Sequence, residues 1–348
     1  MRTFLLTISV DKKIKQVLAV LCFICFVSCK QETKPYSQIT GAAQGTTFKI
    51  VFESVSEQDY SSSIDSLLKV IDESMSLWDQ NSLISRINTS EDTLIIDSHF
   101  KKVFERTTHF YNVSEGRFDP TVGPLLTAWG LARKSNLPIP TQTQIDSLLG
   151  YVDFSSFELK GNKLQKLKSN IELDFNAIAQ GYSVDALGDF LEEKGIKNYL
   201  IELGGEIKTK GYNQFKEPWK VGIERPDFND SDSNNAIQTV VGLSDLSLAT
   251  SGSYRKYVEF DGKKYSHTID PRTGWPVNHN LLSVSVITPS AMDADALATM
   301  FMVLGKEKAL EYANKNDILV QCISDNLGEL EVSFSEGFEE ILIEQTNN

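Results

Sequence analysis

Two side chains in the segment from Thr288 to Met300 have the chemistry and the spacing of a metal site. Asp295 and Thr299 lie four residues apart, so on a helix they share one face. A carboxylate and a hydroxyl one turn apart offer two hard oxygen ligands to Mg²⁺. The alternative is structural, with an acidic residue complementing the helix dipole and a threonine packed against alanine. Asp293 points elsewhere on such a helix.

A histidine lies in the polar sequence Ser-His-Thr-Ile-Asp-Pro-Arg-Thr-Gly. The neighbours of His267 are hydroxyl, carboxylate and guanidinium groups, which can shift the pKa of its imidazole. The alternative is a structural histidine beside a Pro-Arg-Thr-Gly turn. We interpret His99 and His109, on an expected amphipathic helix, as structural or surface residues, and His279 as peripheral.

Three further segments combine glycine with acidic or amide residues at expected loops. Residues 114–124 hold Asp119 before a proline, and the alternative there is a simple Asx turn. Residues 174–182 run from a strand into a helix, whose N-terminal N–H groups suit a phosphate. The alternative for them is close helix packing by small residues. Gly204 and Gly205 separate two expected strands and allow a bulge or the approach of a ligand.

The elements that must position these residues follow from hydrophobic periodicity. Helices are expected at 61–75, 99–111, 140–149, 178–194, 291–304 and 306–315. Strands are expected at 47–52, 157–159, 171–175, 198–203, 206–211, 219–224, 239–242, 257–260, 282–287, 318–323, 330–334 and 341–344. Because helices and strands are interleaved and many strands are joined by hairpins, we expect an α+β fold with a mixed, largely antiparallel sheet and packed helices.

The composition is that of an ordinary globular protein and excludes several classes of function. The chain has 348 residues, of which 41% are hydrophobic and 23% charged, which rules out a disordered, a collagen-like or a multi-span membrane protein. With 34 basic and 47 acidic residues, the formal net charge is −13. Such a surface repels phosphate backbones, so we expect no nucleic-acid partner.

Three of the four cysteines lie near the start of the chain and indicate an export signal. Basic residues precede an apolar run at 17–27, which is too short to span a bilayer comfortably. Ser28 precedes Cys29, which resembles a bacterial lipobox, where the cysteine is lipidated after cleavage. The alternatives are an uncleaved anchor or an ordinary signal peptide. The expected organisation is a lipoprotein signal peptide at 1–28, a tether at 29–40 and one large domain at 41–348.

Taken together and in order, these segments resemble the ApbE family, the FAD:protein FMN transferases. The resemblance runs from Gly45-Thr46-Thr47-Phe48 to Asp295-Ala296-Leu297-Ala298-Thr299 and covers most of residues 41–305. It also includes residues 74–88, with Trp78. Single motifs are weak evidence, but six or more in order with compatible spacing are specific.

The resemblance implies an ApbE-like fold and an enzyme that cleaves FAD and attaches FMN to a Thr or Ser of an acceptor protein, releasing AMP. It implies FAD as the substrate and Mg²⁺ as the cofactor. The acceptors that it implies are exported respiratory or redox proteins. Together with the expected signal, it predicts a protein held by a lipid anchor to a bacterial membrane, on the periplasmic side.

Matching positions assign roles residue by residue. By this resemblance, Ala177 binds the metal through its backbone carbonyl, and Asp295 and Thr299 bind it through their side chains. His267 is the base for the acceptor hydroxyl, and Asp295 is the second catalytic residue. The flavin or adenine contacts implied by the resemblance are Gln44, Trp78, Arg117, Phe118, Asp119, Asp174, Gln180 and the backbone of Ile269.

The sequence departs from the family pattern at three places, and it leaves two other functions open. Gln180 stands where a lysine is usual, which removes a positive charge near the phosphates. Gln44 replaces a usual methionine, and Asn176-Ala177 stands where Gly-Gly is common. The alternatives are a Mg²⁺-dependent FAD pyrophosphatase that yields FMN and AMP, and a lipoprotein that binds FAD without chemistry.

Overall fold

The computed structural model describes residues 35–54, 58–131, 139–226, 236–253, 257–260, 263–266 and 268–346, and only the backbone at 257–260 and 263–266. The unit from Pro35 onward has an α+β fold, as the sequence predicts. Within the described ranges, no helix has the length and apolar character needed to cross a membrane. The expected signal peptide, Cys29 and His267 lie outside the described residues.

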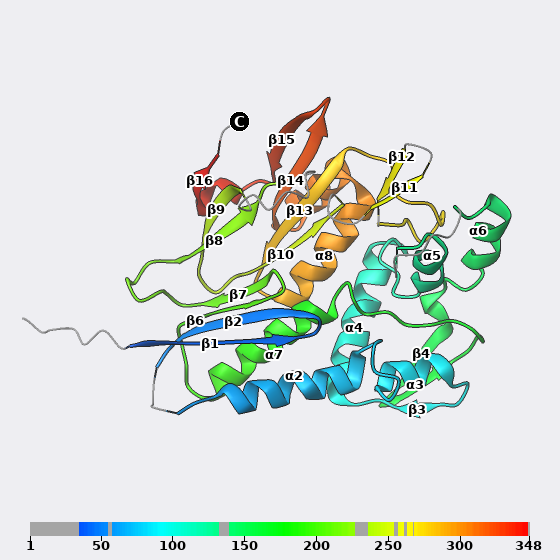
Figure 1. Cartoon of the computed structure of the whole chain (residues 1–348), viewed down its shortest axis with the longest axis horizontal. Coiled ribbons are helices and arrows are strands. Elements are labelled where there is room, and N and C mark those ends of the chain that lie inside the picture. Colours follow the sequence, from blue (N-terminus) through cyan, green and yellow to red (C-terminus); the bar gives the residue numbers. More distant parts are fainter. Residues whose placement is uncertain are drawn as a thin grey trace, which may run out of the picture. The chain divides into compact units, whose positions relative to one another are not determined.

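An eight-stranded sheet forms the centre of this unit (Figure 1). Each neighbouring pair of its strands is antiparallel. In spatial order the strands are β1 (Tyr36–Ala43), β2 (Thr46–Glu53), β6 (Tyr199–Leu203), β7 (Glu206–Lys210), β10 (Ser247–Gly252), β13 (Leu281–Thr288), β14 (Leu319–Asn326) and β15 (Glu329–Phe334).

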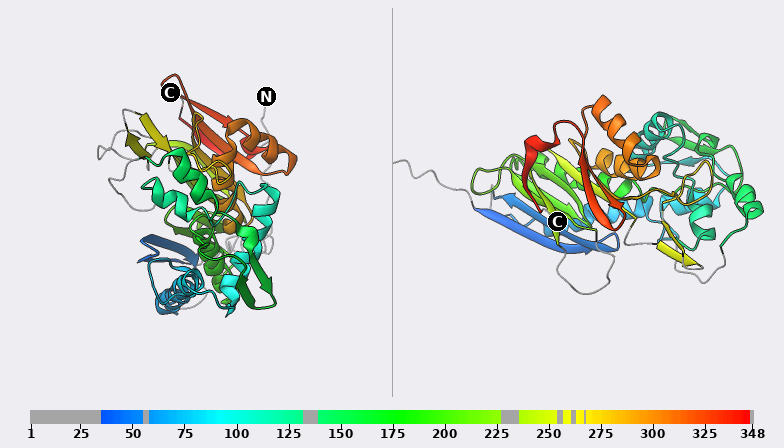
Figure 2. Two further views of the ribbon diagram at one scale, coloured as in Figure 1. Left: turned by 90° about the vertical axis from the view of Figure 1, so that its right-hand side faces the viewer. Right: turned by 90° about the horizontal axis from the view of Figure 1, so that it is seen from above.

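Strand β13 is buried along its whole length because both of its faces are covered. On one face, α8 (Ala291–Leu304) packs against β10 and β13, and α9 (Lys306–Lys315) packs against β14. On the other face, Leu248 and Ile287 share an apolar core with the smaller sheet. That sheet, visible beside the large one in Figure 2, consists of β8 (Trp219–Glu224), β9 (Ile237–Leu243) and β16 (Leu342–Gln345), and Phe338 of the short helix η2 (Phe338–Ile341) closes the layer.

Two helices cover the first strands of the large sheet. The alternating residues Phe48, Ile50 and Phe52 of β2 are buried in one apolar cluster with α2 (Ser61–Met75) and α7 (Ala179–Glu193). The period of two on the strand therefore meets helical stripes of apolar residues, which is the pattern that sequence periodicity predicts here.

The remaining elements include one helix, α4 (Ser98–Val113), that contacts α8. They are α3 (Leu83–Thr89), α4 (Ser98–Val113), α5 (Gly123–Ala128), α6 (Gln142–Leu149), η1 (Phe154–Ser156), the small sheet of β3 (Leu94–Ile95), β5 (Lys163–Lys166) and β4 (Phe157–Lys160), and the hairpin of β11 (Tyr257–Phe260) and β12 (Lys263–Ser266). Arg106 on α4 forms a bidentate ion pair with Asp293 on α8, so these two helices are joined by charge as well as by packing.

The expected hairpin of 157–159 with 171–175 is wrong in its second strand. β4 pairs instead with β5, immediately after the turn. Residues 171–175 are not a strand, although Ile171, Leu173 and Phe175 are buried. The Leu173 N–H donates to the Asn88 side chain, and the Asp174 N–H donates to the Pro120 carbonyl. Buried alternation therefore arises here without a strand partner, because side chains and a loop satisfy the backbone.

The expected tether of 29–40 is also too long at its C-terminal end. Residues 36–40 belong to β1, which pairs along its whole length with β2. Because β1 is an edge strand with several exposed side chains, it lacks the hydrophobic alternation of β2, and the sequence pattern does not reveal it. The domain therefore begins before Gly41.

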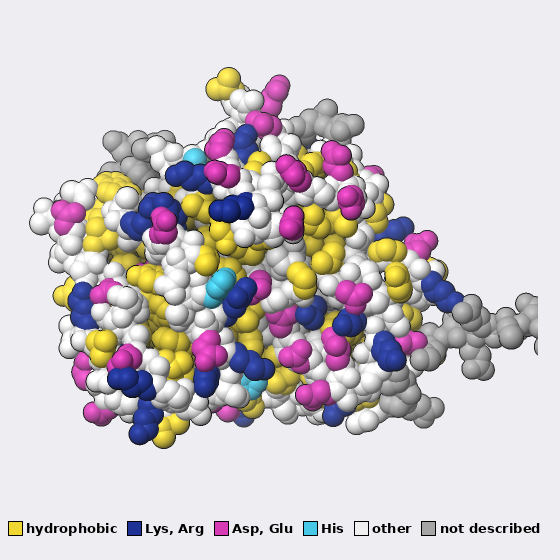
Figure 3. Space-filling model, turned by 180° about the vertical axis from the view of Figure 1, so that it is seen from behind, with side chains coloured by type: hydrophobic (Ala, Val, Ile, Leu, Met, Phe, Trp, Pro, Cys, Tyr) yellow, Lys and Arg dark blue, Asp and Glu magenta, His cyan; other side chains and the backbone are white. Residues whose placement is uncertain are grey.

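The charges of the described surface are mixed. On the face shown in Figure 3, Lys and Arg side chains alternate with Asp and Glu side chains instead of gathering in patches of one sign. The net negative charge of the chain therefore does not create a single acidic patch on this face.

Cys322 is expected to be chemically inert in the folded protein. Its side chain on β14 is buried in the core shared with α8, and burial raises the pKa of the thiol to about 12. Because the thiolate is the reactive form, alkylation of Cys322 by iodoacetamide at pH 8 should be at least ~100-fold slower in the native chain than in denaturant. Peptide mass spectrometry measures this, and equal rates in both conditions would contradict the placement.

Candidate active site

Asp295 and Thr299 project from one face of α8, as their spacing predicts. Asp295 is only 6% exposed, and its Oδ2 accepts a hydrogen bond from the Gly181 N–H at 3.0 Å. Burial raises the pKa of Asp295 to about 7. The Thr299 hydroxyl lies 3.3 Å from that of Ser251 on β10. One carboxylate and one hydroxyl, a helical turn apart on α8, thus lie where α8 meets α7 and strand β10.

The close approach of α7 to α8 depends on a glycine. A Cβ atom at Gly181 would lie 2.8 Å from the Asp295 Cβ and would collide with the Ala291 carbonyl. Only glycine lets the first turn of α7 reach the Asp295 carboxylate. Ala177 lies just before this turn, so the expected carbonyl ligand belongs to the segment that contacts Asp295.

Asp174 lies at the start of the same segment, next to the loop that carries Asp119. The Asp174 N–H donates to the Pro120 carbonyl at 2.8 Å, so the two loops expected to bind flavin are adjacent. Asp174 Oδ1 accepts from the Asn176 N–H, and burial raises the pKa of the Asp174 carboxyl. This carboxyl is therefore held by its own loop at the edge of the junction.

The side chains of the Arg117-Phe118-Asp119 loop, which is expected to bind flavin, make contacts within the fold. Phe118 is buried and packs edge-to-face on Phe110. Asp119 Oδ1 accepts from the Thr121 N–H at 2.8 Å, so the Asx turn considered from sequence is present. Burial raises the pKa of Asp119. Arg117 Nη1 donates to the Ser114 carbonyl at 2.9 Å.

Two of the expected flavin contacts lie on further loops, and they differ in exposure. The indole of Trp78 is 72% exposed. Ile269 is buried with Trp129, and its backbone bridges to Pro276. Burial alone would raise the pKa of the next residue, Asp270, but hydrogen bonds from Arg272 outweigh it and lower the pKa, with a smaller contribution from the charge of Arg117. The loops at 117 and 270 are therefore near one another.

Gln180 and Gln44 are both tied into the frame of the site. Gln180 Nε2 donates to the Leu203 carbonyl at 2.9 Å and fills the space beside Gly204, where a Cβ would collide with it. Gln44, in the turn between β1 and β2, donates to the Ser183 hydroxyl on α7 at 2.8 Å. Both glutamines thus fasten turns of the sheet to α7.

Glu206 is a further acidic residue that the sequence reasoning did not single out. It begins β7 directly after Gly204 and Gly205, and its Oε2 is buried with no hydrogen-bond partner in the described part of the chain. Burial, and then the charge of Asp295, raise the pKa of Glu206 well above its usual value. The only sequence signal was the Gly-Gly pair, which placed a close approach here without naming the carboxylate.

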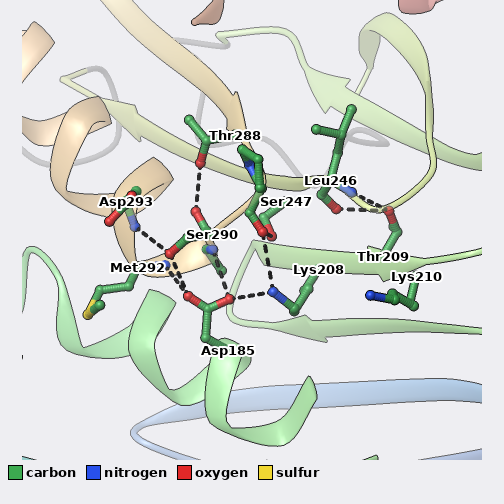
Figure 4. A network of polar contacts seen from close by, with 12 residues as sticks. Asp185, Lys208, Thr209, Lys210, Leu246, Ser247, Thr288, Ser290, Met292 and Asp293 are labelled. Atoms are coloured by element: carbon green, nitrogen blue, oxygen red, sulfur yellow. Dashed lines mark hydrogen bonds and ion pairs between the residues drawn. The ribbon is translucent and has the colours of Figure 1, made fainter. Parts of the chain in front are cut away.

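Asp185 on α7 holds the N-terminus of α8 in place (Figure 4). Its carboxylate accepts hydrogen bonds from the N–H groups of Ala291 at 3.0 Å and Met292 at 2.9 Å, and from the Ser290 hydroxyl at 2.7 Å. It also accepts from Lys208 Nζ on β7 at 2.7 Å. One carboxylate therefore joins α7, α8 and β7, the three elements that surround the candidate metal ligands.

The residues that could hold a metal are of mixed chemistry. Among the described residues there is no group of three His, Cys, Asp or Glu side chains that could hold a metal. The available oxygens are instead the Asp295 carboxylate, the Thr299 hydroxyl and backbone carbonyls near Ala177. These are hard ligands of the kind that Mg²⁺ accepts together with water.

Comparison with known proteins agrees with this arrangement. The family model described as "ApbE family" matches residues 44–323. The chain belongs to the ApbE family. This confirms the resemblance that the ordered motifs indicate.

Relatives in the ApbE family match nearly the whole chain. A protein of Haemophilus influenzae named FAD:protein FMN transferase is 36% identical over 90% of this chain and 93% of its own length. A protein of Vibrio cholerae with the same name is 34% identical over 88% of this chain and 92% of its own length. The solved flavin transferase ApbE from Vibrio cholerae superposes with a TM-score of 0.78 at 33% identity, over 88% of this chain and all of that one. The apo ApbE of Pseudomonas stutzeri superposes with a TM-score of 0.79 at 29% identity, over 88% of this chain and 96% of that one.

Asp185→Asn should lower stability, because the amide loses the charge that four donors share. The expected loss in the free energy of unfolding is about 1.5–3 kcal/mol, the range for hydrogen bonds to charged groups. Urea denaturation measures it. The matched control is Asp189→Asn, one turn further along α7, where burial raises the pKa of the carboxyl and removal of charge should change stability by less than ~0.5 kcal/mol. Equal losses in both variants would show that the Asp185 contacts carry no special stability.

Proposed function

We propose that this chain is a Mg²⁺-dependent FAD:protein FMN transferase. The observation that carries the proposal is the buried carboxylate of Asp295, one helical turn from Thr299 on α8, in a chain that matches transferases of the ApbE family over about nine-tenths of its length. The fold alone would not suffice, because function resides in the site.

The proposed reaction joins an acceptor hydroxyl to the FMN half of FAD. The oxygen of a Thr or Ser attacks the phosphorus on the FMN side, and the bond from that phosphorus to the bridging oxygen breaks. AMP leaves with the bridging oxygen, and the hydroxyl proton passes to a base. Such transfer depends on positioning and on neutralisation of charge.

The donor set fits a divalent cation. Asp295 is buried, and among the described residues it takes part in no ion pair and accepts one hydrogen bond, from the Gly181 N–H. A bound Mg²⁺ would neutralise phosphate charge as a Lewis acid. In this proposal Asp295, Thr299 and the Ala177 carbonyl hold the cation, in a site that the Asp185 contacts keep rigid.

The remaining residues of the proposal bind and orient FAD. The adjacent loops of Asp119 and Asp174 would contact the flavin or adenine, together with Arg117, Phe118 and the backbone of Ile269. Trp78 offers an exposed aromatic face to a ring. Gln180 and Gln44 would border the ligand from the turns that they fasten.

Three outcomes of one assay separate the proposed transferase from the alternatives. The full chain is incubated with FAD, Mg²⁺ and an acceptor that carries a Thr or Ser motif. We expect covalent flavin fluorescence on the denatured acceptor and release of AMP. FMN and AMP formed without acceptor would instead indicate a pyrophosphatase, which the neutral Gln180 would favour by weakening the hold on phosphate. FAD recovered intact would indicate a binding protein.

The proposed location is the outside of a bacterial membrane, with Cys29 as the lipid-bearing residue. Its support is the sequence alone: the basic residues, the short apolar run at 17–27, and Ser28 before the cysteine. The respiratory or redox acceptors proposed for the enzyme are reached from that side. Metabolic labelling with a palmitate analogue tests the anchor, and loss of label in Cys29→Ser is the expected result.

Asp295→Asn should lower Mg²⁺-dependent turnover at least ~100-fold, because the amide removes the negative charge from the proposed ligand set. The rate of AMP release measures this. The matched control is Asp293→Asn, on the same helix but paired with Arg106, which should lower stability and leave the dependence on Mg²⁺ unchanged. A fully active Asp295→Asn enzyme would rule out the metal assignment.

His267→Ala should impair transfer more than binding of FAD. A positioned general base contributes roughly 10²–10⁴-fold to a rate, whereas the affinity for FAD rests on other residues. Acceptor flavinylation and quenching of flavin fluorescence measure the two quantities separately. If both fall in parallel, His267 holds the loop in shape instead of moving a proton.

A further inference from the structure

We propose that Glu206 is the second carboxylate of the cation site and that its Oε2 supplies negative charge to the bound ion. The inference rests on the cation site of the proposed function and adds to it a residue that the sequence reasoning did not assign. It follows from the position of Glu206, from its unsatisfied oxygen and from the charges of its surroundings.

The position of Glu206 places it at the junction that holds Asp295. Strand β7, which Glu206 begins, contacts both α7 and α8. The turn before it is fixed to the first turn of α7, since Gln180 Nε2 donates to the Leu203 carbonyl and occupies the space over Gly204. The next residue of α7, Gly181, donates to Asp295. A short chain of contacts thus links the β6–β7 turn to the Asp295 carboxylate.

The unsatisfied oxygen distinguishes Glu206 from its neighbour Glu202. Glu202 Oε1 accepts the Gly205 N–H at 3.0 Å, within the same turn. Glu206 Oε2 is buried and lacks a hydrogen-bond partner in the described part of the chain. A buried carboxylate oxygen without a donor is costly, so an atom of this kind indicates a group that the protein chain itself does not provide.

Two negative charges act on Glu206, those of Asp295 and, more weakly, Glu202, and no described basic side chain forms an ion pair with it. Asp295 is close enough for its charge to act on Glu206. Lys208, two residues along β7, is the basic group of this strand nearest in sequence, and it is engaged by Asp185 and by the Pro289 carbonyl. Gln180 contributes a neutral amide. The Asp295 carboxylate and the Glu206 Oε2 atom are therefore buried without a paired cation from the described chain.

A divalent cation accounts for all three observations at once. Two buried like charges raise the free energy of the folded state, and one ion of charge +2 offsets both. Mg²⁺ prefers carboxylate oxygens and retains several of its waters, so Glu206 can act on it directly or through such a water. With Glu206 included, the site has two carboxylates on opposite elements, α8 and β7, with the first turn of α7 between them.

The test is a titration of the full chain with Mn²⁺ alone, in the absence of FAD, followed by calorimetry and by electron paramagnetic resonance of the free ion. Glu206→Gln should weaken Mn²⁺ binding about 10–100-fold, the range found when residues that support a metal site are lost. A purely structural role for Glu206 predicts a lower melting temperature and an unchanged Mn²⁺ affinity.

Three further variants make the result interpretable. Glu202→Gln changes the same charge in the same turn and should leave Mn²⁺ affinity within about twofold of wild type. Glu206→Asp keeps the charge on a shorter side chain and should restore part of the lost affinity. Asp295→Asn should abolish binding.

The outcomes separate this inference from the proposed function. Wild-type binding that is lost in Asp295→Asn but unchanged in Glu206→Gln overturns the role of Glu206 and leaves the Mg²⁺ site intact. The inference and the proposed function are both overturned if the wild-type protein does not bind Mn²⁺, or if Asp295→Asn binds it as well as the wild type does. Weaker Mn²⁺ binding by Glu206→Gln, with unchanged binding by Glu202→Gln, supports Glu206 as the second carboxylate.

Discussion

The four hydrogen bonds to the Asp185 carboxylate are the constraint on which the site depends. A helix begins with N–H groups that have no partner within it, and α8 gives two of these to a side chain from another helix. The same carboxylate binds Lys208 of β7, so the helix start is fixed in both position and rotation relative to the sheet. The rotation of α8 matters because a single side chain of this helix, Asp295, accepts the hydrogen bond from Gly181. An error of one residue in the helix would turn that carboxylate away from Gly181.

The architecture explains why the site forms at this place and not elsewhere on the sheet. Strands β10 and β13 are covered on both faces, which leaves little room for a ligand along their length. At the ends of the strands the chain must turn, and the turns at 44, 174–181 and 203–206 meet the start of α7. Gly181 and Gly204 remove the side chains that would keep these turns apart. The turns can therefore carry polar groups into a region that the packed layers support.

The sequence predicted the parts of the molecule in which local pattern and burial agree. The helical stripe of 291–304 gave α8 and the shared face of Asp295 and Thr299, and the apolar alternation of 47–52 gave β2. It missed β1, whose pairing with β2 is specified by backbone hydrogen bonds and not by side-chain pattern. It also read 171–175 as a strand, because buried alternation does not reveal that Asn88 and Pro120 supply the partners. Glu206 was missed for a related reason, since its burial beside Asp295 joins residues 89 positions apart.

The charge balance of the site connects the departure at position 180 to the need for a cation. Where a lysine is usual in the family, this chain has Gln180, whose amide donates a hydrogen bond to the Leu203 carbonyl. The nearby lysine of β7 is held by Asp185, because the start of α8 needs that network. Neither of these two positions therefore supplies a positive charge to Asp295 and Glu206. In the proposed function a bound cation would supply this charge, and the same cation would meet the pyrophosphate of FAD. The ion pairs and hydrogen bonds of the protein thus stabilise the frame, whereas a bound cation would supply the charge at the reacting phosphates. The frame can therefore be rigid, while the charge depends on binding.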